Sequence, residues 1–406
     1  MGNEKQHKWK ALFRGQRSTL DAEHQALLTV NRGAVWVHAA SVGEFEQARP
    51  LIERLRGEQP QRKIVVTFFS PSGYEARKNY AQADAVVYLP LATRRKAKRF
   101  LEVLQPSMAI FVKYEFWPAY LRELKKRGIP TYSISAIFRP TQRFFHWYGK
   151  GALRLLRCFT HIYVQDEASR RLLAEHGVHE CSVAGDTRFD RVNEVLALTR
   201  ERADGRLLPV AQFVENAPRV VIAGSTWPED EELLQQYMEE SGAKLILVPH
   251  EINEEHLHFI FQRFKGRFVR YTDIAGEQVQ TPGMSRLNIL QQADVLVIDT
   301  IGLLSSMYHF GHVAYIGGGF GEGIHNTIEA AVYGLPVVFG PNYHHFREAQ
   351  GLIDAGAARS IKNYSELEAA LNTALDDYET IGAKAAEYVQ SELGATAKIY
   401  DEIFAI

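Results

Sequence analysis

The stretch Gly317–Pro341 reads GGGFGEGIHNTIEAAVYGLPVVFGP and places five glycines in its first seven positions. Glycine permits positive φ angles and lets a ligand approach the main chain closely. The apolar run His312–Ile316 precedes the glycines, and a helix-like segment follows them. This order predicts a phosphate site, because free N–H groups and the positive end of a helix dipole attract anions.

The common nucleotide fingerprints do not fit this glycine loop. The pattern G-x-G-x-x-G fails from each possible start, because its last position falls on Glu322, Ile324 or Asn326, and the chain contains no G-x-x-x-x-G-K-[ST]. What remains is a loop and helix start for a phosphate, followed by Glu329, whose carboxylate can accept both hydroxyls of a ribose. This arrangement indicates a nucleotide sugar.

Short apolar runs separated by segments of helical period extend outward from this loop through the whole chain. Runs of this kind are typical of buried parallel strands joined by crossover helices. The runs are Ala34–His38, Lys63–Phe69, Ala85–Leu89, Met108–Val112, Thr131–Ser135, His161–Gln165, Arg219–Ala223, Lys244–Val248, Val295–Asp299, His312–Ile316 and Pro336–Phe339. We predict an α/β fold with two doubly wound Rossmann-like domains facing a cleft, 1–200 and 201–406, the last helix packing back on the first domain.

The formal net charge of −1 hides a division between the two halves of the 406 residues. Residues 1–200 contain 33 Lys and Arg against 19 Asp and Glu, so the first half is basic and the second is acidic. A basic half indicates an anionic partner such as a phosphorylated substrate, an acidic lipid or a nucleic acid. Two cysteines in the chain indicate a reducing compartment, and no apolar run approaches the length of a membrane span.

Three glutamates follow N-cap residues at the spacing of a capping box. The pairs are Ser41 with Glu44, Thr226 with Glu229, and Asn326 with Glu329. A structural role as cap is therefore one reading of each glutamate. A chemical role is the other, because each helix start follows the carboxyl end of a predicted strand, where ligands bind in such sheets.

Several motifs, in order along the chain, resemble the Kdo transferases of lipopolysaccharide synthesis. They are HAASVGE at 38–44, EFWP at 115–118, GDTRFD at 185–190, AGSTW at 223–227, PH at 249–250, and GGGFG at 317–321 followed by His325, Asn326 and Glu329. Within that family the chain is similar to the branch with KYEFW, here 113–117, and IFRP, here 137–140. The match extends from about Trp36 to about Ile361.

The resemblance implies a GT-B enzyme that moves 3-deoxy-D-manno-octulosonic acid (Kdo) from CMP-Kdo to a lipid A precursor, with inversion and without a metal or other cofactor. The family usually carries an N-terminal hydrophobic anchor, whereas Met1–Arg17 is polar and basic. We therefore expect peripheral attachment to the anionic cytoplasmic face of the inner membrane. We expect no nucleic acid partner, because the chain lacks the corresponding motifs.

The resemblance also assigns roles to individual residues. Glu44 is the general base, and Glu115 orients the acceptor or Glu44. For Glu115 and Lys113, which follow the same apolar run, a structural ion pair is the alternative. The residues expected to bind the donor are Ser225, Thr226, Pro249, His250, Gly318, Gly319, Gly321, His325, Asn326 and Glu329. The residues expected to bind the acceptor or the Kdo carboxylate are Lys113, Arg139 and Arg188. Another GT-B nucleotide-sugar enzyme, a UDP-sugar transferase or a 2-epimerase, remains the alternative.

Overall fold

The computed structural model describes residues 19–147, 149–201, 204–264, 268–275 and 286–404. Among these, the residues up to Arg191 together with those from Glu392 onward form one compact unit, and Val192–Ser391 form a second. We call them unit 1 and unit 2 and describe each by itself.

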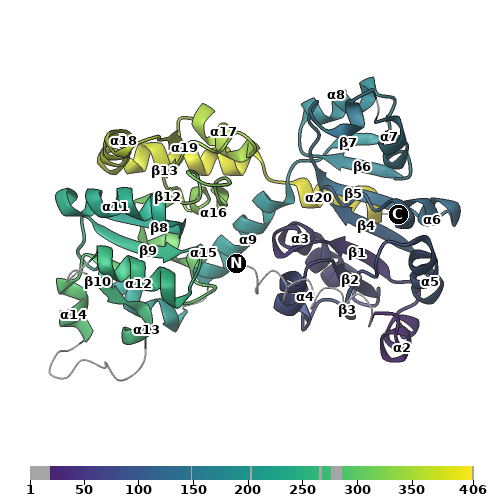
Figure 1. The fold of residues 1–406 in the computed structure, drawn as a ribbon, viewed down its shortest axis with the longest axis horizontal. Coiled ribbons are helices and arrows are strands. Elements are labelled where there is room, and N and C mark those ends of the chain that lie inside the picture. The colour runs from purple at the N-terminus through teal and green to yellow at the C-terminus, as the bar shows by residue number, and fades with distance from the viewer. Residues whose placement is uncertain (1–18, 148, 202–203, 265–267, 276–285, 405–406) are drawn as a thin grey trace. The chain divides into compact units, whose positions relative to one another are not determined.

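Unit 1 is built on a parallel sheet of seven strands in the order β3-β2-β1-β4-β5-β6-β7 (Figure 1). The strands are β1 Val35–Ala39, β2 Ile64–Phe68, β3 Ala85–Tyr88, β4 Met108–Val112, β5 Thr131–Ala136, β6 His161–Val164 and β7 Cys181–Val183. Every residue of β1, β2 and β4 is buried, as expected for strands that are covered on both faces. The order reverses between β1 and β4, so the topological switch point lies there.

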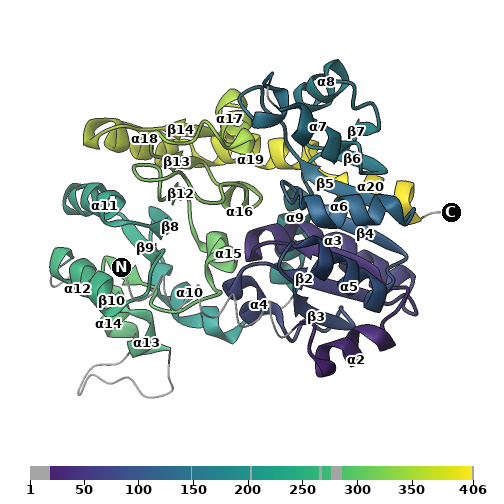
Figure 2. The same cartoon turned by 45° about the vertical axis from the view of Figure 1, so that its right-hand side comes forward.

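Helices cover both faces of this sheet (Figures 1 and 2). One face packs against α2 Ala22–Val30, α5 Arg94–Leu104, α6 Pro118–Lys126, α7 Lys150–Leu156 and α8 Glu167–Glu175. The other packs against α3 Val42–Glu58, α4 Pro71–Arg77 and α20 Ala395–Phe404. The last of these helices is held in unit 1 by Asp190, whose carboxylate accepts the N–H groups of Gly394 and Thr396 at 2.8 and 2.7 Å. The helix α9, Thr187–Glu201, leads into unit 2.

Unit 2 repeats the architecture with strand order β10-β11-β9-β8-β12-β13-β14. Its strands are β8 Val220–Thr226, β9 Lys244–Pro249, β10 Phe268–Arg270, β11 Val295–Val297, β12 Val313–Ile316, β13 Val337–Phe339 and β14 Ala358–Ser360. Its α-helices are α10 Leu208–Val214, α11 Pro228–Ser241, α12 Glu254–Arg263, α13 Tyr271–Ile274, α14 Arg286–Gln292, α15 Leu304–Met307, α16 Ile328–Ala331, α17 Arg347–Asp354, α18 Tyr364–Asp376 and α19 Tyr378–Ser391. The switch point lies between β8 and β12.

The predicted doubly wound fold is therefore present in both units. Ten of the eleven predicted strands overlap a strand within one or two residues, and the eleventh, Arg219–Ala223, continues to Thr226 as β8. The prediction missed β7, β10 and β14. All three have three residues and lie at the edge of a sheet, where a strand is covered less and needs no apolar run. No described helix combines the length and hydropathy needed to cross a bilayer.

Candidate active site

Glu44 lies in the first turn of α3, directly after the carboxyl end of β1 and at the switch point of unit 1. Ser41 is the N-cap of this helix, and the predicted capping box is confirmed. Glu44 Oε2 accepts the N–H groups of Ala40 and Ser41 at 2.7 and 3.0 Å. Among the residues that the structure describes, none donates a hydrogen bond to Glu44 Oε1. The cap thus occupies one carboxylate oxygen and leaves the other to accept a proton.

The pKa of Glu44 is raised above its ordinary value. Burial is the largest cause, and the negative charge of Glu115 adds to it. The N–H groups of Ala40 and Ser41 and the charge of His38 act in the opposite direction but do not cancel the increase. A carboxylate whose pKa is moved toward neutral pH is a better general base than an ordinary surface glutamate.

Glu115 follows β4, the strand on the other side of the switch point. Its side chain is 13 % exposed, and its Oε2 lies 3.2 Å from His38 Nε2 and 2.5 Å from Trp117 Nε1. His38 is fully buried on β1. The structure therefore brings both predicted catalytic carboxylates to one end of the sheet, and their side chains interact electrostatically.

The predicted acceptor residues lie on three segments of unit 1. Lys113 directly follows β4 and has a φ of +55°, in the left-handed region that side chains rarely adopt. Arg139 donates to the hydroxyl of Tyr114 at 3.3 Å. Arg188 donates Nε and Nη2 to Asp186 Oδ2 at 2.9 and 2.7 Å. Burial acts to raise the pKa of Asp186, but the charge and hydrogen bonds of Arg188 hold this pKa below its ordinary value. A large part of the hydrogen-bonding capacity of Arg188 is therefore used inside the protein.

A cavity of about 500 Å³ lies in unit 2 beyond the carboxyl ends of β8, β9 and β12. Parallel α/β sheets bind ligands at this position. The residues that line it are Trp227, Glu229, His250, Gly318, Gly321, Glu322, Gly323, His325 and Phe346. Four of the predicted donor-binding residues are therefore in the cavity wall, namely His250, Gly318, Gly321 and His325.

Three rings in the cavity wall are stacked in sequence. The ring of Trp227 stacks on His250 with 4.8 Å between centroids, and His250 stacks on His325 with 4.3 Å. Trp227 Nε1–H also donates to His325 Nε2 at 3.2 Å. Burial, with a smaller contribution from the charge of His250, lowers the pKa of His325 to about 4. His325 is therefore neutral at pH 7, and its proton lies on Nδ1, because Nε2 is the acceptor.

The glycine loop is shaped by close backbone contacts. A Cβ on Gly318, which has a φ of +90°, would lie 2.5 Å from the carbonyl oxygen of Gly323 and 3.1 Å from the His325 ring. Gly319 packs on Gly340, where a Cβ would lie 2.6 Å from the backbone. The N–H of Gly318 donates to the buried Asp230 at 2.9 Å. The sequence predicts that this N–H group holds a phosphate, but in the structure the protein itself uses it.

The other predicted donor residues lie around the cavity and are not part of its wall. Thr226 is fully buried and donates to Glu231 Oε1 at 2.8 Å. Each carboxylate oxygen of Glu329 accepts one hydrogen bond of 2.8 Å, Oε2 from Ser305 Oγ and Oε1 from Asn326 Nδ2. The remaining two, Ser225 and Pro249, lie at the ends of β8 and β9. The helix expected after the glycine loop is the single turn α16, Ile328–Ala331.

Sequence reasoning missed the aromatic side of the cavity. Trp227 belongs to the AGSTW motif, in which the sequence predicts donor contacts only for Ser225 and Thr226. Phe346 lies far along the chain in a segment with no recognised motif, and only the fold brings it to the glycine loop. Trp117 and His38 were likewise inside quoted motifs. The common signal is an aromatic or histidine side chain at the carboxyl end of a strand.

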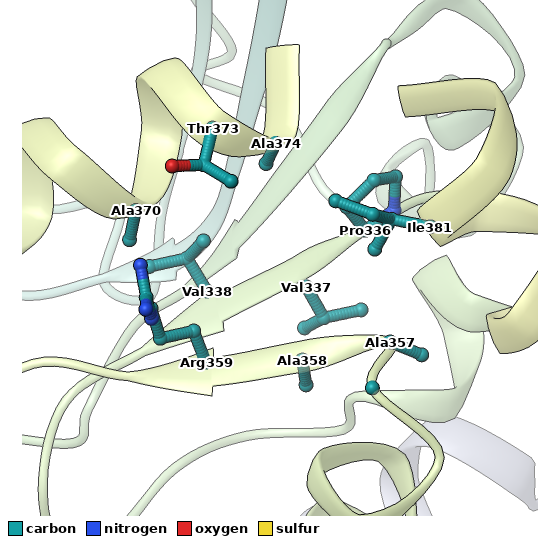
Figure 3. Close-up of a pocket in the computed structure, with 11 residues that line it drawn as sticks. Pro336, Val337, Val338, Ala357, Ala358, Arg359, Ala370, Thr373, Ala374 and Ile381 are labelled. Atoms are coloured by element: carbon teal, nitrogen blue, oxygen red, sulfur yellow. The ribbon is translucent and has the colours of Figure 1, made fainter. Parts of the chain in front are cut away.

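A second cavity, of about 170 Å³, lies between the β13–β14 edge of the sheet, α18 and α19 (Figure 3). Of its lining residues only Arg359 and Thr373 carry polar side chains, and the rest are glycine or apolar. The larger cavity at the strand ends has the histidines and backbone groups that a nucleotide requires. It is the better candidate for the donor site.

Comparison with known proteins is consistent with this geometry. The model of the 3-deoxy-D-manno-octulosonic-acid transferase (kdotransferase) family matches residues 9–191. The transferase of that name from Aquifex aeolicus is 27% identical over 347 residues, 83% of this chain and 84% of the relative. The one from Haemophilus influenzae is 26% identical over 388 residues, 90% of this chain and 86% of the relative.

Among solved structures, a UDP-GlcNAc 2-epimerase from Neisseria meningitidis has a TM-score of 0.64 at 15% identity, and the match covers 92% of this chain and 100% of that one. This likeness concerns the fold alone. The chain is therefore a relative of the Kdo transferases, which are glycosyltransferases, and it has the two doubly wound Rossmann-like sheets of the GT-B fold.

Proposed function

We propose that this chain is an inverting glycosyltransferase that moves Kdo from CMP-Kdo to a lipid A precursor in lipopolysaccharide synthesis. The curated relatives, which are named Kdo transferases, support the reaction class. The observation that carries the proposal is the carboxylate of Glu44, which has one oxygen bound by the cap, the other without a donor among the described residues, and a raised pKa. Capping does not require a second carboxylate nearby, whereas Glu115 lies close enough to raise the pKa of Glu44.

In the proposed reaction, Glu44 Oε1 takes the proton from a hydroxyl group of the acceptor. The hydroxyl oxygen attacks the anomeric carbon of Kdo, and the bond from that carbon to the phosphate oxygen breaks on the opposite face. The electron pair of that bond leaves with CMP, so the anomeric configuration inverts. Glu44 needs to be ionised before the step and is protonated after it.

Unit 2 would supply the donor site in this proposal. The stacked rings of Trp227, His250 and His325 offer an aromatic surface to a nucleotide, and Gly318 and Gly321 of the glycine loop line the same cavity. His325 Nδ1–H would donate to an oxygen of the phosphate without carrying a charge. A neutral donor that is fixed before the reaction stabilises charge that develops on the leaving group.

The proposed acceptor is a lipid, and we propose that the chain attaches peripherally to the anionic cytoplasmic face of the inner membrane. The start of α5 supports this with basic side chains at Arg94, Arg95, Lys96, Lys98 and Arg99, four of which are exposed. The basic residues of the polar segment Met1–Arg17 would add to this charge but lie outside the described residues; they are Lys5, Lys8, Lys10, Arg14 and Arg17. The reaction as proposed needs no metal and no cofactor, and we propose no nucleic acid partner.

The test is incubation of the purified chain with CMP-Kdo and a tetraacyl lipid A precursor, followed by mass spectrometry of the lipid. The expected product is heavier by one or more Kdo residues, and it should be absent with Glu44→Gln. Thermal stabilisation by CMP but not by UDP would separate this activity from the alternative of a UDP-sugar transferase or 2-epimerase. Stabilisation by UDP alone, with no Kdo on the lipid, would refute the proposal.

A further inference from the structure

The surroundings of Glu115 contain more hydrogen-bond donors than a surface carboxylate requires. His38 and Thr67 are paired across β1 and β2, and His38 Nδ1 lies 2.9 Å from Thr67 Oγ1. Thr67 Oγ1 already accepts the indole N–H of Trp36 at 2.8 Å, so its own proton is available for His38 Nδ1. All three side chains are fully buried. A chain of hydrogen bonds therefore leads from the core to Glu115.

The protonation of His38 follows from its partners. With Thr67 donating to Nδ1, a neutral His38 carries its proton on Nε2, 3.2 Å from Glu115 Oε2. A doubly protonated His38 would donate Nδ1–H to the carbonyl oxygen of Thr67, 3.1 Å away, and would again point Nε2–H at Glu115. The remaining form, a neutral His38 with its proton on Nδ1, would place an unprotonated Nε2 against the carboxylate of Glu115. The two favourable forms both make His38 a donor to Glu115.

Trp117 supplies the second donor to the same oxygen. Its Nε1 lies 2.5 Å from Glu115 Oε2 and 3.0 Å from His38 Nε2, so the carboxylate is the closer acceptor. Ring packing fixes the indole, because Trp117 contacts His38 edge-on at 6.0 Å and Phe69 at 5.0 Å between centroids. Two N–H groups directed at one carboxylate oxygen stabilise its ionised form.

We propose that His38 and Trp117 are positioning residues that hold Glu115 as an anion beside Glu44, so that Glu115 supplies a fixed negative charge and Glu44 accepts the proton. Neither residue touches the reacting atoms. The proposal rests on the proposed function, because it assumes that Glu44 is the base. The two neighbouring carboxylates take different roles because their environments differ. Side-chain N–H groups bind Glu115, whereas Oε1 of Glu44 accepts no hydrogen bond from the described residues.

The electrostatics of Glu44 agree with this division. The charged groups that act on Glu44 are Glu115, which raises the pKa, and His38, which lowers it. Lys113 is two residues from Glu115, and its charge acts on Asp186.

The experiment follows the side-chain carboxyl carbons of Glu44 and Glu115 by NMR in the full chain labelled with ¹³C at Glu Cδ, without substrate. Glu44→Gln and Glu115→Gln identify the two signals by their loss. We expect Glu115→Gln to shift the titration of Glu44 to lower pH. We expect Trp117→Phe, which keeps the ring and removes the N–H, to shift the titration of Glu115 to higher pH.

His38→Gln is the second variant, since the loss of a fully buried ring risks the fold, whereas Trp117 is only half-buried. Trp147→Phe, at a side chain that is 87% exposed, is the matched control and should move neither titration. The proposal is overturned if Glu44 titrates identically with and without the charge at position 115. It is also overturned if Trp117→Phe leaves the Glu115 titration where it is.

A kinetic arm separates this inference from the proposed function. In Trp117→Phe the acid limb of the kcat/KM profile should change while the KM for CMP-Kdo stays within about twofold, since the donor contacts are untouched. If Glu44→Gln keeps full Kdo transfer, the proposed role of Glu44 fails. The NMR titrations would still show whether the two carboxylates are coupled, because they need neither substrate nor turnover.

Discussion

Replacement of Glu44 by Gln separates its two possible roles. As a cap, the side chain needs only to accept the N–H groups of Ala40 and Ser41, which the amide oxygen of Gln does at the same distances of 2.7 and 3.0 Å. As a base it needs an ionisable carboxylate. We therefore expect the melting temperature of Glu44→Gln to stay within about 2 °C of the parent, since loss of a cap costs only about 0.5–2 kcal/mol even when it is complete.

Turnover should fall by about 10²–10⁴-fold in the same variant, the usual contribution of a positioned base and about 3–5 kcal/mol of activation free energy. Glu44→Ala is the comparison, because it removes the cap and the base together and should lower both the melting temperature and turnover. The assays are a thermal melt and initial rates of Kdo transfer. The reasoning is refuted if Glu44→Gln keeps most of its activity while Glu44→Ala mainly lowers the melting temperature. Glu115 would then be the next candidate for the base.

Three further predictions concern other parts of the molecule. Because the pKa of His325 is about 4, titration of His325 should not change the CMP affinity measured by calorimetry between about pH 6 and 8. His325→Ala should weaken CMP binding, whereas Glu44→Gln should leave it unchanged. Burial acts to lower the pKa of His256, but the hydrogen bond to Glu231 and the charge of that residue raise this pKa above its ordinary value. Protonated His256 therefore stabilises the folded protein. This contribution is complete below the pKa of the unfolded state, about 6.5, and is lost as the pH rises through the pKa of the folded state. The melting-temperature difference between the parent and His256→Gln should therefore shrink from pH 6 to pH 9, and a constant difference would contradict this. Replacing Arg94 and Arg95 by Glu should weaken sedimentation with anionic vesicles by about 1 kcal/mol or more per charge at low salt, and equal binding to neutral vesicles would count against the membrane role.

The sequence predicted the central strands well because these are buried on both faces and are therefore mostly apolar. The register that places His38 beside Thr67 is a result of strand pairing, and no local pattern carries it. The contact between His38 and Glu115 joins positions 77 residues apart. The network around Glu115 could therefore be found only from the fold, although His38, Glu115 and Trp117 lie in recognisable motifs.

The three predicted capping boxes also show that local sequence spacing does not fully determine which side chains contact each other. Only that of Ser41 and Glu44 is present. In α11 the N-cap is Trp227, and Asp230, not Glu229, accepts its N–H at 2.9 Å. Before α16, Asn326 contacts Glu329 through its side chain, and the N-cap is Thr327. A one-residue shift in where a strand ends changes which side chain is the cap, and spacing alone does not determine that shift.

The return of the chain into unit 1 has a consequence for synthesis on the ribosome. Tyr400 and Phe404 of α20 pack against the far end of α3, where Gln59 donates to the hydroxyl of Tyr400 across 341 residues of sequence. One face of the first sheet therefore lacks one of its three covering helices until the whole of unit 2 has been translated. A nascent chain would expose the apolar surface of α3 that α20 covers during that interval, and a fragment that ends before residue 392 would expose it permanently. Any chimera that exchanges unit 2 must therefore be joined at two points, near residues 191 and 392, and must keep the native C-terminal helix.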